Sequence, residues 1–317
     1  MFLSHSICFW SDITIYSFQV VLMSSVPLKV SLNVVQVEVV YDVFLYHRIH
    51  FSSVLHDGQR NKILLAGCNK KRDNKVVIKL MPILSHEDAD RFIYEVCLMK
   101  LAADIPGVVT LSSVTRCDNN GYFIMPFYEK RDLLSQEGNL SHFSWFKVFV
   151  TMAVTLRRLH KKRIYYQDLR PQNILLTDSH VAFISDFGAA SLLPKGSDKV
   201  DTWTAAPGFR GPEADQEGGP FCPFQLDTYS LAVSMWQVLS GLCPVKNKPL
   251  DHLDNIPPQY APLLKKLLRP DPDKRWTLDK FLTEALVLRP DLTCFCLGFL
   301  DPDPSVPRSI DRQCYSS

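Results

Sequence analysis

The sequence predicts an α+β fold with two lobes, in which a small β-rich lobe with one helix precedes a larger, mainly helical lobe. A chain of 317 residues can bury a substantial core and is somewhat long for one compact domain, so its length favours one two-lobed domain or two small ones. From about residue 45 to residue 125, short β-rich runs alternate with polar turns, whereas beyond Tyr128 apolar residues recur at helical spacing. We therefore expect an N-terminal extension of unassigned role (1–45), one domain (46–290) with a small lobe (46–127) and a large lobe (128–290), and a C-terminal tail (291–317).

In the small lobe, the sequence predicts β-hairpins on either side of one helix. Ser85 is a typical N-terminal helix cap, Asp88 stands three residues later as its capping-box partner, and apolar residues follow at helical spacing. Two pairs of β-rich runs, each joined by a polar turn, are typical of hairpins: residues 60–67 with 75–81, and residues 108–115 with 121–127.

The large lobe begins with a long amphipathic helix predicted at residues 144–163. Its basic C-terminal end suits the negative pole of the helix dipole. Residues 226–241 are apolar almost all round, which predicts a buried central helix that ends at Gly241. Two later helices are expected at residues 261–268 and 278–288.

Composition excludes several classes of function. The net charge of +2 gives no reason to expect a nucleic-acid partner. The uncharged run at residues 13–28 is shorter than the ~20 apolar residues of a membrane-spanning helix, so we expect no membrane span. Nine cysteines without a C-x-x-C pair favour reduced thiols and an intracellular protein, cytoplasmic or nuclear.

Several residues that could carry chemistry have ordinary structural explanations when they are taken singly. Lys79 could be a solvated strand lysine, Glu95 a surface charge on a helix, and the D-F-G sequence at residues 186–188 a turn. Their order and spacing change this interpretation, because D-L-R-P-Q-N at residues 168–173 and G-P-E at residues 211–213 complete the series. This series matches the protein-kinase signature set. From about Leu55 to Leu286 the chain resembles a eukaryotic-type protein kinase domain of the serine/threonine group.

The resemblance implies a two-lobed protein kinase-like fold and transfer of the ATP γ-phosphate to a Ser or Thr hydroxyl of a protein substrate. Asp168 would accept or orient the proton of that hydroxyl, and Arg170 would place positive charge near the transferred group. Lys79 would contact the α- and β-phosphates while Glu95 keeps it in place.

The resemblance also implies a Mg²⁺ site and an adenine site. Asn173 and Asp186 would hold Mg²⁺ with hard oxygen ligands. Met125 stands at the gatekeeper position, the Pro126 carbonyl and the Tyr128 N–H would face adenine, and Asp132 would bind the ribose. The nucleotide-binding residues expected in full are Gly58, Ile63, Val77, Lys79, Met125, Pro126, Tyr128, Asp132 and Leu175.

Framework residues of the family are present as well. An apolar stack across both lobes, an anchoring aspartate for its base, and an ion pair that ties the activation segment to the large lobe are expected. The stack would comprise Met99, Leu111, Tyr166 and Phe187, the anchor would be Asp227, and the ion pair would join Glu213 to Arg275.

Four departures from the family pattern leave a second interpretation open. The glycine-rich loop keeps only Gly58, Tyr166 replaces His, Gln167 replaces Arg (a non-RD loop), and Ala206 replaces Thr. None of them removes a phosphate, metal or base residue, which favours an active enzyme. The degenerate loop and Ala206 keep open a pseudokinase that acts as a binding scaffold. Because neutral Gln167 cannot form a charge-assisted pair with a phosphate, we expect activity that needs no activation-loop phosphorylation.

Overall fold

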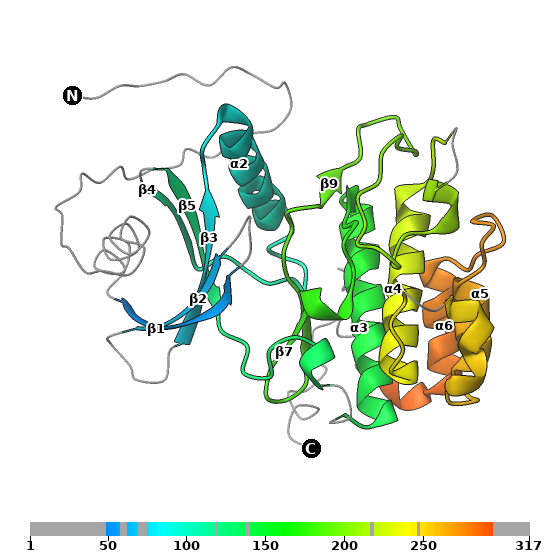
Figure 1. The fold of residues 1–317 in the computed structure, drawn as a ribbon. Helices are drawn as coiled ribbons and strands as arrows, with labels where there is room; N and C mark the ends of the chain where they lie inside the picture. Colours follow the sequence, from blue (N-terminus) through cyan, green and yellow to red (C-terminus); the bar gives the residue numbers. More distant parts are fainter. Residues whose placement is uncertain are drawn as a thin grey trace, which may run out of the picture.

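The fold in the computed structural model has the two predicted lobes (Figure 1). An antiparallel sheet with helix α2 forms the smaller lobe, and helices α3 to α6 lie together in the larger lobe (Figure 1). The structure describes residues 49–57, 62–68, 75–117, 119–136, 140–215, 219–245 and 248–293. Both the α+β class and the two-lobed organisation are therefore confirmed, whereas the exact domain limits stay a prediction.

The small lobe is built on a five-stranded sheet in the order β1-β2-β3-β5-β4. Direct cross-strand partners point to the same face of a sheet, so the register assigns each residue to a face. One face packs a small apolar cluster that includes Leu64, Ile78 and Tyr122. The other face carries Lys79, which stands opposite Ile63 on the neighbouring strand. The strands are β1 (Ile49–Asp57), β2 (Lys62–Cys68), β3 (Lys75–Pro82), β4 (Ser113–Cys117) and β5 (Asn120–Pro126).

Helix α2 (His86–Leu101) begins at the predicted cap. The Ser85 hydroxyl accepts the N–H of Asp88 at 3.1 Å, and the Asp88 carboxylate accepts the N–H of Leu84 at 3.1 Å. Phe92 meets Phe123 of β5 edge to face with ring centroids 4.9 Å apart, which fixes the helix against the sheet. The predicted helix and its cap are confirmed.

One predicted strand begins too early. Residues 108–115 were expected to form the first strand of the second hairpin, but β4 begins only at Ser113. The N–H of Val109 instead donates to the Ile184 carbonyl at 2.9 Å, and Val108 forms an isolated bridge with Ile184 in β8 (Ala182–Ile184) of the large lobe. A buried β-branched run does not specify its partner, so composition alone placed this boundary wrongly.

The large lobe packs around α4, whose apolar circumference is buried as predicted. This helix ends at Gly241, whose φ of 68° lies in the left-handed region that glycine adopts without strain. Two short strand pairs, β6 with β9 and β7 with β8, flank the loops that contain Asp168 and Asp186. The helices are α3 (His142–Lys161), α4 (Pro223–Ser240), α5 (Ala261–Leu267) and α6 (Leu278–Leu288), and the remaining strands are β6 (Ile164–Tyr165), β7 (Ile174–Leu176) and β9 (Ser191–Leu192).

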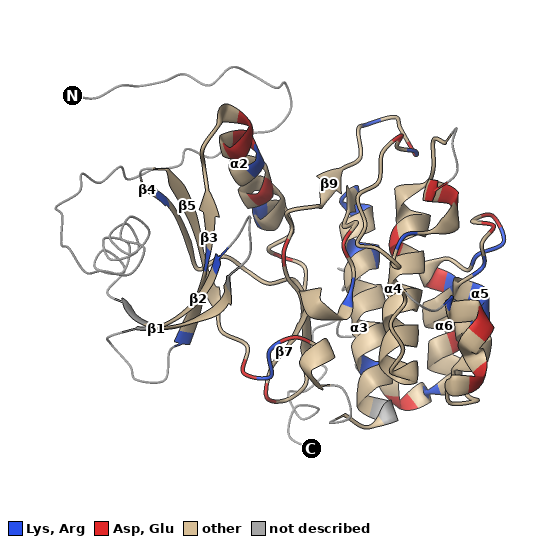
Figure 2. Ribbon diagram, in the orientation of Figure 1, with Lys and Arg blue, Asp and Glu red and all other residues tan. Residues whose placement is uncertain are grey.

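Charges are mixed over the outer elements of both lobes (Figure 2). Basic and acidic residues both occur on α2 and α6, whereas the charged residues of α5 are lysines (Figure 2). In the part of the chain that the structure describes, no helix is both long and apolar enough to cross a membrane. The run at residues 13–28, for which no span was expected, lies outside the described residues.

Candidate active site

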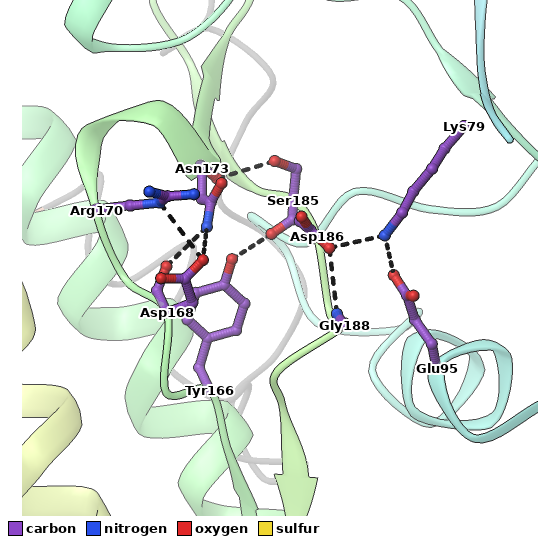
Figure 3. Close-up of polar contacts among 9 residues, drawn as sticks. All are labelled: Lys79, Glu95, Tyr166, Asp168, Arg170, Asn173, Ser185, Asp186 and Gly188. Atoms are coloured by element: carbon purple, nitrogen blue, oxygen red, sulfur yellow. Dashed lines mark hydrogen bonds and ion pairs between the residues drawn. The ribbon is translucent and has the colours of Figure 1, made fainter. Parts of the chain in front are cut away.

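Lys79 joins three elements of the two lobes at one point. Its Nζ donates to Glu95 Oε1 of α2 at 2.7 Å and to Asp186 Oδ1 in the loop after β8 at 2.8 Å. Figure 3 shows Asp186 between this pair and the residues of the loop around Asp168. Because Lys79 and Glu95 are both buried, the solvated lysine and the surface glutamate are excluded as explanations.

The three charges of this cluster shift one another's pKa values. Burial alone would lower the pKa of Lys79, yet the adjacent Glu95 and Asp186 carboxylates hold it above its usual value. Burial would likewise raise the pKa of Asp186, but the charge and hydrogen bond of Lys79 outweigh it and lower that pKa. For Glu95 burial outweighs Lys79, and its pKa is raised. Lys79 and Asp186 therefore stay charged at neutral pH.

The carboxylate of Asp168 is held from several sides by the loop that contains it. Asn173 Nδ2 donates to Asp168 Oδ2 and to the Asp168 carbonyl, both at 2.8 Å, and Arg170 Nε lies 3.4 Å from Oδ2 (Figure 3). The backbone N–H of Ala206 faces the same carboxylate and acts to lower its pKa. Burial raises the pKa of Asp168 above its usual value. This is a positioned carboxylate suited to general-base chemistry.

A buried aspartate of α4 fixes the backbone of that loop. Asp227 accepts the N–H of Tyr166 and the N–H of Gln167, each at 2.8 Å, and His160 Nε2 lies 2.9 Å from its Oδ2. Gln167 adopts a φ of 70°, a left-handed conformation that these bonds stabilise in a residue other than glycine. Asp227 thus anchors the loop, as the resemblance implied.

The expected apolar stack is formed at its base. The Tyr166 ring meets the Phe187 ring edge on at a centroid distance of 5.5 Å, and both are buried in the main core together with Met99. Leu111 is partly buried and packs against the same core. The Tyr166 hydroxyl also donates to the carbonyl of Ser185, a bond that the sequence did not predict (Figure 3).

Ser185 is a further site residue that sequence reasoning missed. Its N–H and its hydroxyl donate to the Asn173 carbonyl at 2.9 and 3.0 Å, so it couples the two expected metal-binding residues. Nothing in the sequence marks this serine except its place directly before Asp186.

Asn173 and Asp186 fit a Mg²⁺ ion that is shared with substrate phosphates. The Asn173 amide nitrogen is committed to Asp168, which leaves the amide oxygen as the ligand atom. Asp186 has a φ of 55°, and the Gly188 N–H donates to its Oδ1 at 3.2 Å. No group of three His, Cys, Asp or Glu gathers among the described residues, and Mg²⁺ commonly needs only one or two carboxylates beside phosphate oxygens.

The expected adenine-side residues share the Lys79 face of the sheet. Ile63 is the register partner of Lys79, and Met125 is the register partner of Val77 two residues along β3. These three apolar side chains are only partly buried. On the large-lobe side, Leu175 of β7 is also partly buried.

The remaining expected nucleotide contacts have mixed outcomes. Pro126 is the last residue of β5. The Tyr128 ring packs on the Phe183 ring, with the ring centroids 4.9 Å apart. One oxygen of Asp132 accepts the N–H of Ser135 at 3.0 Å, so this residue caps a turn and its ribose role stays a prediction. Gly58 lies outside the described residues.

Glu213 and Arg275 form the expected ion pair beneath the activation segment. Two parallel bonds of 2.6 and 2.8 Å join the guanidinium to the carboxylate, a bidentate arrangement with strong directionality. The Arg275 side chain is buried, so loss of Glu213 would leave a buried positive charge without its counter-ion.

The comparisons agree with this geometry. Residues 50–287 match the family described as "Protein kinase domain", and the chain therefore belongs to the protein kinase family. Among similar proteins, CBL-interacting serine/threonine-protein kinase 26 of Arabidopsis thaliana is 26% identical over 237 residues, which cover 68% of this chain and 54% of that protein.

Two animal proteins are also similar to this chain, with different identities and coverages. Protein kinase C delta type of Mus musculus is 27% identical over 244 residues, covering 71% of this chain and 36% of that protein. Rhodopsin kinase GRK1 of Homo sapiens is 33% identical over 136 residues, covering 38% of this chain and 24% of that protein. The matched part thus spans about half or less of the length of these relatives.

Proposed function

We propose that this protein transfers the γ-phosphate of ATP to Ser or Thr hydroxyls of protein substrates in a Mg²⁺-dependent reaction. One observation carries the proposal: Lys79 bonds Glu95 and Asp186 at the same time. Phosphoryl transfer in protein kinases requires both the lysine–glutamate pair and the metal-binding aspartate in place. The names of the relatives, serine/threonine-protein kinase among them, support the choice of hydroxyl.

The arrangement of the residues around Asp168 supports the proposal. Asp168 would take the proton of the attacking hydroxyl, and the hydrogen bond from Asn173 orients its carboxylate. Arg170 places a positive charge beside Asp168, where the transferred group would approach. Mg²⁺ held by Asn173 and Asp186 would neutralise charge on the phosphate oxygens.

The alternative, a scaffold that transfers nothing, rested on Ala206 and the degenerate glycine-rich loop. The Ala206 backbone N–H faces Asp168 and acts to lower the pKa of its carboxyl, so this position still favours the charged carboxylate without a threonine hydroxyl. This contact weakens the first argument for a scaffold. The second argument concerns residues outside the described part of the chain.

The test compares the full chain with its Asp168→Asn variant. We expect ATP to raise the melting temperature of the wild type when Mg²⁺ is present and not when it is absent. The variant should show the same shift, because Asp168 is not a metal ligand. Transfer of labelled γ-phosphate to an array of Ser, Thr and Tyr peptides should occur with the wild type alone. A wild type that neither shifts with Mg·ATP nor labels any peptide would favour the scaffold.

A further inference from the structure

One side chain connects two parts of the activation segment (residues 189–210) to the loop around Asp168. The Gln167 amide is buried, and its Nε2 donates to the Ala189 carbonyl at 2.6 Å. Its Oε1 accepts the N–H of Thr204 at 3.0 Å and the Thr204 hydroxyl at 3.2 Å. Ala189 directly follows the D-F-G sequence, and Thr204 lies two residues before Ala206, which contacts Asp168.

The two ends of this bridge require opposite hydrogen-bonding properties. A backbone carbonyl at Ala189 needs a donor, whereas a backbone N–H at Thr204 needs an acceptor. An amide supplies both, so the orientation of the Gln167 side chain follows from its partners. Arginine could donate to Ala189 but would meet the N–H and hydroxyl of Thr204 with further donors. An arginine at residue 167 would therefore need an added anion on this side, which is what a phosphate provides.

The rest of the segment is also held without a phosphate. Arg163 donates to the carbonyls of Leu193 and Pro194 at 3.2 and 2.6 Å, so its guanidinium is already engaged with backbone. Trp203 is buried and stacks on Tyr165 with ring centroids 6.0 Å apart. Thr204 itself is held through its N–H and its hydroxyl by the Gln167 side chain.

We propose that Gln167 and Thr204 form a neutral latch that holds the unmodified activation segment, and that a phosphate on Thr204 opens this latch and lowers transfer. The proposal rests on the proposed function. Thr204 is exposed and so accessible to a protein kinase acting in trans. In that reaction the Thr204 oxygen bonds to the γ-phosphorus of ATP, ADP leaves and the hydroxyl proton is released.

The charge change works against the latch. The phosphorylated oxygen no longer has a proton to donate, and its negative charge stands beside Oε1 of Gln167, which is itself an acceptor. Separation of Thr204 from Gln167 would displace the nearby Ala206, whose backbone N–H faces the Asp168 carboxylate and favours its charged form. The effect therefore falls on the transfer step, and Lys79 with its two carboxylates is not involved.

The experiment uses the full chain with phosphothreonine incorporated at residue 204 or, as the matched control, at the nearby exposed Thr202. Phosphate on Thr204 should lower kcat about tenfold or more and change KM for ATP by less than about twofold. It should also raise backbone hydrogen exchange at residues 189–206, whereas phosphate on Thr202 should not. Thr204→Val, which loses only the hydroxyl bond, should cost about two- to tenfold in kcat, and Thr204→Ser should recover it.

The Gln167→Arg variant tests the direction in which phosphate on Thr204 changes activity. Without phosphate this variant should be less active than the wild type, and phosphate on Thr204 should raise its activity, because arginine can pair with the new anion. A phosphate that activates the wild type, or that acts in the same direction in both proteins, would overturn the latch. If the wild type transfers no phosphate, the proposed function fails. Hydrogen exchange of the wild type and of Gln167→Arg, each with and without phosphate on Thr204, still decides whether the latch exists.

Discussion

Replacing Lys79 by methionine tests whether the charge balance of the site stabilises the fold. The Lys79 and Glu95 side chains are each 6% exposed, and their charged atoms lie 2.7 Å apart. Methionine has a similar length and no charge, so the variant leaves Glu95 buried without its cation. Asp186 loses less, because its side chain is 41% exposed and water can replace the lysine.

The cost to stability is limited by protonation of Glu95. From an ordinary glutamate pKa of ~4.3, neutralising this carboxyl costs at most about 3.7 kcal/mol at pH 7 and about 1 kcal/mol at pH 5. Burial already raises the pKa of Glu95 in the wild type, so part of this cost is present before the change. We expect a loss of about 2–3 kcal/mol at pH 7 and less than about 1 kcal/mol at pH 5.

The direction follows from proton binding. The folded variant holds a proton on Glu95 that the unfolded chain has lost at neutral pH, so its stability falls as the pH rises above the unfolded pKa. For a domain of this size, each kcal/mol corresponds to about 2–4 °C in melting temperature. Thermal unfolding at pH 5 and pH 7 should therefore show a deficit that is several-fold larger at pH 7.

A matched control separates charge from packing. In the Lys79→Met background, Glu95→Gln removes the stranded carboxylate and should restore most of the stability at pH 7, but not phosphate transfer. A deficit of equal size at both pH values, or no recovery in the double variant, would show that the lysine stem matters through packing and would refute the electrostatic reasoning.

Three other changes have defined outcomes. Asp168→Asn should lower kcat by ~10²–10⁴-fold while the Mg·ATP thermal shift persists; turnover like that of the wild type would remove Asp168 from the mechanism. Arg275→Lys breaks the bidentate pair with Glu213 and should cost about 1.5–3 kcal/mol in denaturant unfolding; an unchanged midpoint would contradict this. Asn61 stands at an outer glycine position of the glycine-rich loop pattern, outside the described residues; if that position requires positive φ, Asn61→Gly should maintain or improve ATP affinity, measured by calorimetry, and a clear loss would indicate that the asparagine side chain contacts nucleotide.

Most helices could be predicted because their signals are local. A cap such as Ser85 and a terminating Gly241 act within one turn, and an apolar face reports burial whatever the partner is. The start of β4 could not be predicted in this way. Val108 and Val109 read as strand residues, but they meet Ile184 of the large lobe, and that choice of partner depends on the whole fold.

The site divides in the same way. The residue types and their order identified Lys79, Glu95 and Asp186 in advance, because each must carry a particular charge. The contacts of Gln167 and Ser185 could not be predicted, since they depend on loop backbone in unusual conformations, such as the φ of 70° at Gln167 and of 55° at Asp186.

The four departures from the family pattern differ in weight once their contacts are known. A comparison of letters counts lost side chains, but other groups act at three of the positions. The Tyr166 hydroxyl bonds the Ser185 carbonyl, the Gln167 amide bonds Thr204, and the Ala206 N–H faces Asp168 and acts to lower its pKa. All three contacts support the arrangement of the transfer step. The degenerate glycine-rich loop is the fourth departure, and it affects binding of the nucleotide phosphates. Any shortfall of this protein relative to its relatives should therefore appear as weaker ATP binding, and the transfer step itself should be largely preserved.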